Sequence, residues 1–172
     1  MHKLYIGLAV FISLLSLPAA FGSMSDARQL RFYHTHTLQE LEITYYRDGA
    51  YQPDALGRLE HFLSDWRNGK AREIDPELMD ILWDIQQLSG HEGVFEVISA
   101  YRSPETNEML RDRSSGVASN SQHVHGKAID VRLRGFDTRQ LRDTALQLKR
   151  GGVGYYAQSD FVHVDTGRVR TW

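Results

Sequence analysis

The sequence contains no cysteine among its 172 residues. This absence rules out disulfide bonds, thiolate metal ligands and a cysteine nucleophile. It also excludes a lipid anchor attached to a cysteine. An exported protein that needs no disulfides fits a bacterial periplasm better than a disulfide-stapled extracellular module.

An excess of charge of either sign is also lacking. The formal net charge of −2 gives no electrostatic case for binding nucleic acid or an anionic membrane surface, so we expect no nucleic-acid partner. Hydrophobic residues make up 41% and charged residues 24%, which is typical of a globular chain and not of a disordered one. The length fits one domain that buries its own core.

Long apolar runs are confined to the N-terminus. Lys3 precedes the almost wholly apolar residues 4–17, and small residues follow at 19–22. This pattern is typical of a secretory signal peptide, and the run is short for a membrane span. We therefore predict a signal peptide at 1–22 and a single domain at 23–172, a periplasmic monomer with no stable membrane span. An uncleaved anchor is the alternative.

Hydrophobic periodicity predicts an α+β fold. Alternating or continuous runs of β-branched and aromatic residues predict strands at 30–37, 41–46, 94–101, 128–133, 153–156 and 161–165. Apolar residues at helical spacing, with turn and capping residues at their ends, predict helices at 53–66, 76–89, 104–111 and 138–150. Short connections favour a central mixed or antiparallel sheet with helices packed to one side.

Residues 121–130, Ser-Gln-His-Val-His-Gly-Lys-Ala-Ile-Asp, carry the strongest chemical signal. The imidazole of His123 and the carboxylate of Asp130 are both good zinc donors. Gly126 and Ala128 are small, so the backbone between the donors can turn tightly and pack closely. One further imidazole would give three protein ligands and an open fourth position, as in catalytic zinc sites.

The complete pattern Ser-x-His-x-x-Gly-x-Ala-x-Asp resembles the signature of a zinc peptidase group. This group includes lysostaphin-type enzymes, D-Ala-D-Ala peptidases and the hedgehog amino domain. Murein endopeptidases of the group resemble the chain further in their His, Asp, His spacing of seven and then thirty-three residues, and in segments 100–104, 151–156 and 161–172.

The resemblance implies a zinc peptidase domain with a hedgehog/D-Ala-D-Ala peptidase-like fold. It implies that His123, Asp130 and His163 bind Zn²⁺. It further implies hydrolysis of peptidoglycan cross-links that contain meso-diaminopimelate, during growth or remodelling of the cell wall, with stem peptides as the binding partner.

Two aspartates near the last histidine are candidates for the general base, which relatives supply as a Glu or His just before that ligand. Asp160 lies three residues before His163, and Asp165 lies two residues after it. An offset of two keeps both side chains on one face of a regular strand. An offset of three points away unless the strand begins after Asp160, so Asp165 is slightly favoured.

Arg102 and His125 are further candidates for the catalytic site. Arg102 follows a predicted strand, where relatives have an arginine near the site, and it would bind a substrate carboxylate or the tetrahedral oxyanion. A surface ion pair is the alternative. If its stretch is extended, His125 shares a face with His123 and would orient substrate or stabilise the oxyanion. Otherwise it is an exposed loop residue. Ser121 lacks the Gly-x-Ser-x-Gly surroundings of a nucleophile.

His34 and His36 lie two residues apart on a predicted strand and therefore share one face. That spacing suits a metal. Local hydrogen bonds or solvent are the favoured explanation of the pair, because the later cluster already supplies a full ligand set.

Two other functions are consistent with the same residues. A D,D- or L,D-carboxypeptidase would remove terminal residues of stem peptides instead of cutting cross-links. A zinc-stabilised binding domain would keep the ligands without turnover, as the hedgehog relative illustrates. The nearby carboxylates favour an enzyme.

Overall fold

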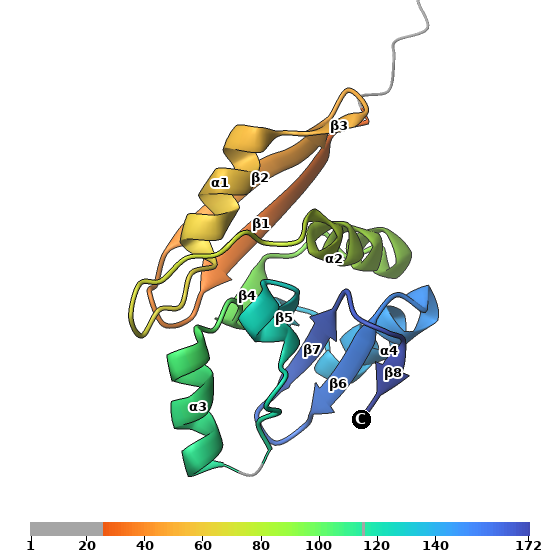
Figure 1. Cartoon of the computed structure of the whole chain (residues 1–172). Helices are drawn as coiled ribbons and strands as arrows, with labels where there is room; N and C mark the ends of the chain where they lie inside the picture. Colours follow the sequence, from red (N-terminus) through yellow and green to blue (C-terminus); the bar gives the residue numbers. More distant parts are fainter. Residues whose placement is uncertain (1–25, 115) are drawn as a thin grey trace, which may run out of the picture.

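The computed structural model describes residues 26–114 and 116–172, and the predicted signal peptide therefore lies outside the described residues. Eight strands form one open mixed sheet in the order β3-β2-β1-β4-β5-β7-β6-β8 (Figure 1). The strands are β1 Arg28–His34, β2 Glu40–Arg47, β3 Ala50–Tyr51, β4 Phe95–Ser99, β5 Ala128–Leu133, β6 Gly152–Tyr156, β7 Phe161–Asp165 and β8 Arg170–Thr171. The helices are α1 Pro53–Phe62, α2 Pro76–Ser89, α3 Pro104–Arg113, the short 3₁₀ helix η1 Gln122–His125, and α4 Thr138–Leu148.

The sheet combines an antiparallel hairpin of β1 and β2 with three pairings between strands that are not consecutive in the chain, β1–β4, β5–β7 and β6–β8. β1 and β2 pair antiparallel, whereas β1 pairs parallel with β4. β5 pairs antiparallel with both β4 and β7, and β6 pairs antiparallel with β7. The predicted α+β class with a mixed sheet is confirmed, and the two-residue strands β3 and β8 are additions that periodicity did not reveal.

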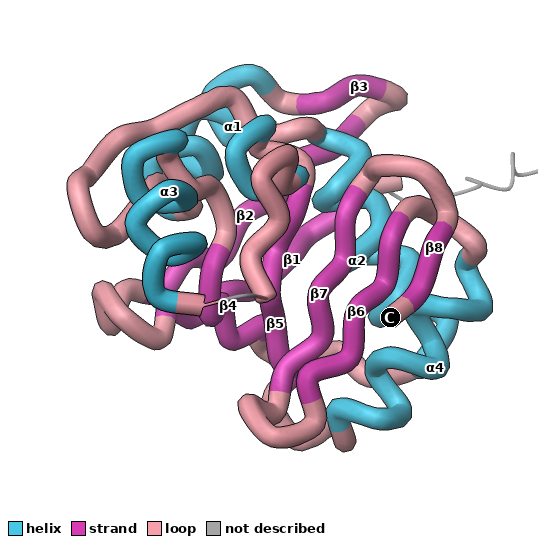
Figure 2. Tube along the Cα trace, turned by 60° about the horizontal axis from the view of Figure 1, so that its bottom comes forward, coloured by secondary structure: helices cyan, strands magenta, loops and turns pink. Residues whose placement is uncertain are grey.

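The hydrophobic core lies on one face of the sheet. Alternate residues of the strands, such as Phe32, Val97 and Val131, form a single buried cluster with residues of α1, α2 and α4. Figure 2 shows α2 and α4 behind the strands. The expectation of helices on one side holds for these three. Among the described residues, α3 adds no side chain to that cluster, and it instead flanks the pocket described below.

Two elements end earlier than periodicity predicts. α1 stops at Phe62, because the Asp65 carboxylate accepts the backbone N–H groups of Arg67 and Ser103 at 3.1 and 2.9 Å and holds a turn. β1 stops at His34, so His36 lies in the following turn and the two histidines do not share a strand face. Both shortened ends leave polar side chains beside the same pocket.

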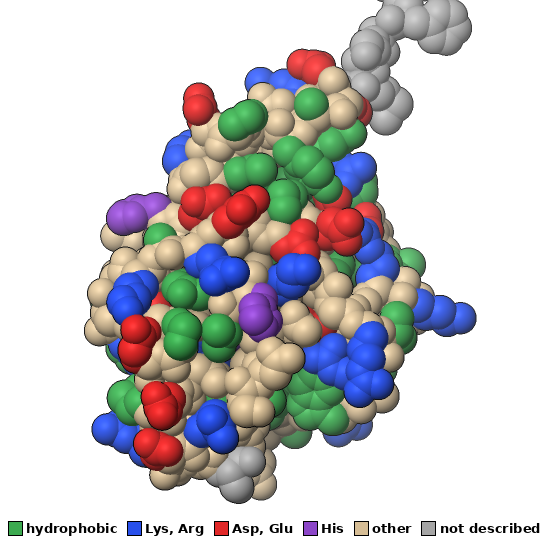
Figure 3. All heavy atoms as spheres, in the orientation of Figure 1, with side chains coloured by type: hydrophobic (Ala, Val, Ile, Leu, Met, Phe, Trp, Pro, Cys, Tyr) green, Lys and Arg blue, Asp and Glu red, His purple; other side chains and the backbone are tan. Residues whose placement is uncertain are grey.

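The surface carries little charge segregation. On the face drawn in Figure 3, acidic and basic side chains are interspersed, which agrees with the small net charge. No helix within residues 26–114 and 116–172 has both the length and the apolar character needed to span a membrane.

Candidate active site

Three donor side chains meet on the polar face of the sheet. His123 comes from η1, Asp130 from β5 and His163 from β7. Asp130 and His163 lie directly opposite each other in the antiparallel β5–β7 ladder, so the sheet register alone brings them together. One potential ligand atom from each residue lies within 4.8 Å of the others, and all three residues are buried.

The turn between His123 and Asp130 depends on Gly126. This glycine ends η1 in the left-handed region with φ of 68°, and a Cβ there would collide with the backbone carbonyl of Glu73. The Gly126 carbonyl accepts the backbone N–H of Asp75 at 3.0 Å. A residue without a side chain is therefore required, as the sequence motif predicts.

The tautomers of the two histidines direct lone pairs to one point. His123 donates from Nδ1 to the Ala100 carbonyl at 2.7 Å, which leaves Nε2 unprotonated. His163 donates from Nε2 to the Asp165 carboxylate at 2.8 Å, which leaves Nδ1 unprotonated in the neutral ring. His123 Nε2 and His163 Nδ1 then face each other at 3.2 Å, beside an Asp130 oxygen 2.9 Å from His163.

Two lone pairs and a carboxylate cannot hydrogen-bond one another without a proton or a cation between them. The donor set of two imidazoles and one carboxylate, each oriented by a partner behind it, fits Zn²⁺ with an open coordination position. This chemistry makes the cluster a candidate metal centre, and His123 Nε2, His163 Nδ1 and an Asp130 oxygen are the atoms that would bind an ion.

The pKa values of the cluster reflect the same convergence. Burial lowers the pKa of His163, but its hydrogen bonds to Asp130 and Asp165 outweigh burial and raise it to about 8. Burial lowers the pKa of His123. Burial would raise the pKa of Asp130, yet the two neighbouring imidazoles hold it below its usual range. Without a metal, a proton on His163 is thus stabilised where a cation would lie.

Asp165 braces His163 from behind. It is fully buried and accepts hydrogen bonds from His163 Nε2, from the backbone N–H groups of Gly152 and Gly167, and from the Arg170 guanidinium. Burial would raise its pKa, but these donors hold the pKa well below the usual range. Its oxygens are occupied and face the side of the ring opposite the cluster. In this geometry Asp165 is placed to orient His163, and its role as a general base stays a prediction.

Asp160 and His125 lie away from the cluster. Asp160 sits in the turn before β7 with φ of 52°, accepts a hydrogen bond from Thr138 at 2.7 Å and is largely exposed. His125 lies in η1 instead of an extended stretch, and its ring contacts Asn120 at 2.9 Å. Neither residue lines the pocket that contains the three donors. β7 does begin directly after Asp160, as its prediction required, but the Asp160 carboxylate is bonded to Thr138 and lies outside the pocket. The extended stretch that the prediction for His125 required is not formed. A catalytic role of either residue stays a prediction.

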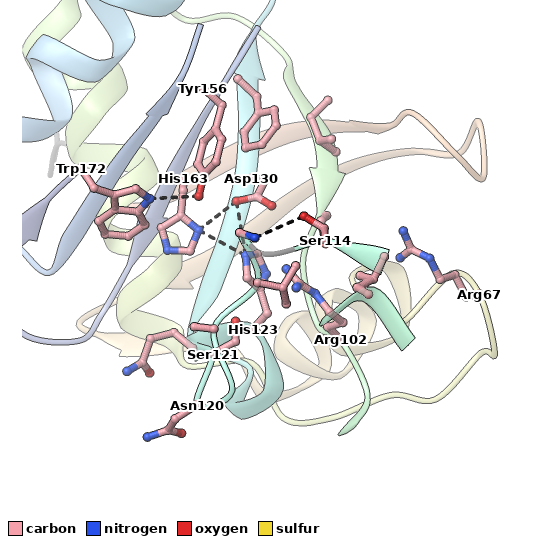
Figure 4. A pocket seen from close by; sticks show the side chains of 18 of the residues that line it. Arg67, Arg102, Ser114, Asn120, Ser121, His123, Asp130, Tyr156, His163 and Trp172 are labelled. Carbon is pink, nitrogen blue, oxygen red and sulfur yellow. Dashed lines mark hydrogen bonds and ion pairs between the residues drawn. The ribbon is translucent and has the colours of Figure 1, made fainter. Parts of the chain in front are cut away.

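The three donors open into a pocket of about 530 Å³ (Figure 4). Arg102 lines it and is only 8% exposed, and its Nε has no hydrogen-bond partner among the described residues. Its Nη1 makes a long 3.3 Å bond to Asn107. Burial lowers the pKa of Arg102. Arg102 therefore lies beside the three donors, as predicted, and it does not form the surface ion pair that was the alternative.

Several pocket residues were not identified as site residues from the sequence. They are Arg67, Tyr156, Arg170 and Trp172, and His36 was noted only as half of a possible metal pair. The Trp172 ring lies 5.1 Å from that of His163, and its Nε1 donates to the Tyr156 hydroxyl at 2.9 Å. The only signal for Tyr156, Arg170 and Trp172 was the resemblance over segments 151–156 and 161–172, because no periodicity marks an aromatic residue as a neighbour of a metal ligand.

Two imidazoles and a carboxylate that converge beside an open pocket form the centre of a metallopeptidase. A family model described as Peptidoglycan L,D-endopeptidase MepK matches residues 22–172. The Peptidoglycan L,D-endopeptidase MepK of Escherichia coli strain K12 is 39% identical over 168 residues, which cover 96% of this chain and 92% of that protein. The Probable peptidoglycan L,D-endopeptidase MepK of Haemophilus influenzae is also 39% identical, with 96% and 90% covered. The chain therefore belongs to the MepK family of metallopeptidases.

Proposed function

We propose that this protein is a zinc endopeptidase that hydrolyses L,D cross-links between peptidoglycan stem peptides in the periplasm, for growth or remodelling of the wall. The observation that carries the proposal is the buried His123, Asp130 and His163 centre, whose lone pairs converge at the floor of an open pocket. Relatives that cover nearly the whole chain are named for this activity.

The residues of the centre have separate tasks in this proposal. When bound, Zn²⁺ would lower the pKa of a coordinated water to about 7 and polarise the scissile carbonyl. His123, Asp130 and His163 hold the ion. Asp165 keeps the proton of His163 on Nε2, so that Nδ1 stays available as a donor.

Arg102 is the group that meets negative charge on the substrate. A buried guanidinium with a free Nε beside a metal centre can donate to a stem-peptide carboxylate or to the oxyanion that develops on the scissile carbonyl. Either contact satisfies a donor that is otherwise buried without a partner, which favours anionic substrates.

The proton acceptor has to come from the pocket lining. Among the described lining residues, Asp130 is the only carboxylate. We infer that the second oxygen of Asp130 or an ordered solvent molecule takes the proton, and that neither Asp160 nor Asp165 does. Asp160→Asn should therefore retain near-wild-type cleavage, whereas a large loss would assign the base to Asp160.

Digestion of defined muropeptides tests the function. The protein without residues 1–22, loaded with zinc or treated with a chelator, is incubated with L,D cross-linked dimers, D,D cross-linked dimers and uncross-linked monomers, and products are identified by mass. We expect cleavage of the L,D dimer that the chelator abolishes and added zinc restores.

Three other outcomes would replace this proposal. Removal of only a terminal residue from the monomers would indicate a carboxypeptidase. Cleavage confined to D,D dimers would change the bond assigned. Stoichiometric zinc without any product would indicate a binding domain. Processing after residue 22, read by mass on protein recovered from a periplasmic fraction, tests the predicted signal peptide and location, and gel filtration tests the expected monomer.

A further inference from the structure

We propose that Trp66, Arg67 and His36 form a second anion subsite at the rim of the pocket, which we call the rim stack. It binds a carboxylate of the stem peptide away from the scissile bond. The free α-carboxylate of γ-linked D-glutamate has the required chemistry. This inference rests on the proposed peptidoglycan substrate, and it identifies residues that would make the protein selective for that substrate.

The three side chains form a continuous stack. The His36 and Trp66 rings lie 4.0 Å apart between centroids with 14° between their planes. The Arg67 guanidinium carbon lies 4.1 Å from the Trp66 ring centroid. His36 and Arg67 line the pocket, and Trp66 is 37% exposed, which is unusual for so large an aromatic side chain. Stacking on Trp66 therefore fixes the two polar side chains at the rim.

Arg67 has no carboxylate partner of its own. Within the described residues it makes no ion pair, because the oxygens of the neighbouring Asp65 accept backbone N–H groups of Arg67 and Ser103. Figure 4 shows Arg67 and Arg102 on the side of the pocket away from Tyr156 and Trp172. Two guanidinium groups without carboxylate partners on one wall form a receptor for anions.

His36 adds a neutral donor or acceptor to this wall. Burial and the charge of Arg67 lower its pKa, so the ring is uncharged near neutral pH, and it hydrogen-bonds the backbone of Ile98. Because the His36 ring is neutral, the Arg67 guanidinium supplies the positive charge of the rim stack.

The position of the rim stack sets the distance between subsites. His36 follows β1, which pairs with β4, and β4 pairs with β5, which carries Asp130. β1 and β5 are thus two strand spacings apart, roughly 10 Å, and His36 lies in the turn that follows β1. The rim stack is therefore placed to meet a carboxylate on a residue next to the one that supplies the scissile carbonyl, and not the scissile group itself.

The test compares peptides that differ at one carboxylate. The probes are L-alanyl-γ-D-glutamyl-meso-diaminopimelate and its glutamyl α-amide, titrated into the zinc-loaded protein, and L,D dimers with the same two chemistries for kinetics. We expect wild-type protein to favour the free acid. Arg67→Gln should bind the acid about fivefold more weakly, so that Kd and KM rise by that factor while kcat is unchanged. This variant should also bind the acid and the amide equally well.

The control is Arg58→Gln, which removes the same charge from an exposed position of α1 outside the pocket. Arg67→Lys should recover part of the preference, because it restores charge without the planar fork. Equal binding of acid and amide by the wild type, or indistinguishable values for the two glutamine variants, would overturn the subsite. Absence of cleavage with the acid preference intact would overturn only the proposed peptidase activity.

Discussion

The two walls of the pocket are built by opposite means. The wall that carries the metal ligands is made of paired strands, and nearly every polar atom behind it has a partner, down to the four donors that hold Asp165. The facing wall is made of the segments that follow β1, α1 and β4, and it presents Arg67 and Arg102 without carboxylate partners among the described residues.

This difference separates two tasks. A metal centre needs ligands held rigidly, and satisfied hydrogen bonds behind each ligand supply that rigidity. A wall that binds substrate needs hydrogen-bond donors that have no protein partner when the pocket is empty. The substrate then displaces water from these donors and does not have to break a hydrogen bond within the protein. Each prediction below removes a group from one wall and asks whether the loss appears in metal binding or in substrate recognition.

Asp130→Asn tests the metal wall most directly. The substitution keeps the size of the side chain but removes the charge that balances the cation. We expect loss of stoichiometric zinc and a fall in muropeptide cleavage of roughly 10³-fold or more, since the metal contributes several kcal/mol to the barrier. Metal content by mass spectrometry and the cleavage rate are measured together. Full activity without bound zinc would remove the metal from the mechanism.

Arg102→Gln tests the facing wall. Loss of a buried charged donor near the developing oxyanion should reduce kcat/KM about 10²-fold while zinc content stays at the wild-type level. Kinetics on the L,D dimer and metal content on the same preparation separate the two walls. A parallel loss of zinc would show that the Arg102 side chain supports the ligands and does not act on substrate.

Asp165→Asn tests the support behind the ligands. An amide nitrogen can donate where the carboxylate accepts, so the proton of His163 would no longer be fixed on Nε2. We expect zinc affinity about 10- to 100-fold weaker, with activity recovered at saturating zinc. Competition with a chelating dye gives the affinity. Unchanged affinity with lost cleavage would return Asp165 to the role of a base.

Trp172→Phe should have the smallest effect. The variant keeps an aromatic ring beside His163, loses the hydrogen bond to Tyr156, and shortens the ring that lies under Arg170 and against Gly154. We expect about 1 kcal/mol lower free energy of unfolding and a change in cleavage within a few-fold. Tyr156→Phe removes the same hydrogen bond from its other end. The double variant should therefore lose no more free energy of unfolding through this bond than either single variant does. Urea denaturation of all three variants measures this.

The convergence of the three donor side chains was predictable from the sequence because their signals are local or follow from strand geometry. His123, Gly126 and Asp130 lie within one short motif, and a single strand histidine, His163, completed the set. The role of Asp165 was not predictable, because its position on the same strand face as His163 is consistent with contact to either nitrogen of that ring. Only the hydrogen bonds from Gly152 and Arg170 show which side it occupies.

The facing wall was largely hidden from the sequence. Helical spacing placed Trp66 on the buried stripe of a longer helix, but a turn held by Asp65 ends the helix at Phe62. His36 was read as a strand residue, but β1 has already ended. Element ends depend on tertiary hydrogen bonds that periodicity does not report, and here these ends carry the side chains of the rim stack.

The direct pairing of Asp130 with His163 joins distant parts of the chain. The two residues are thirty-three positions apart, and α4 and β6 lie between β5 and β7 in the sequence. A one-residue slip of β7 would turn His163 into the core and leave no centre. A bound ion would then act as a cross-link that closes this long loop, and it would bind only the native register. Metal binding would therefore stabilise the correct pairing of β7 with β5 relative to every slipped pairing.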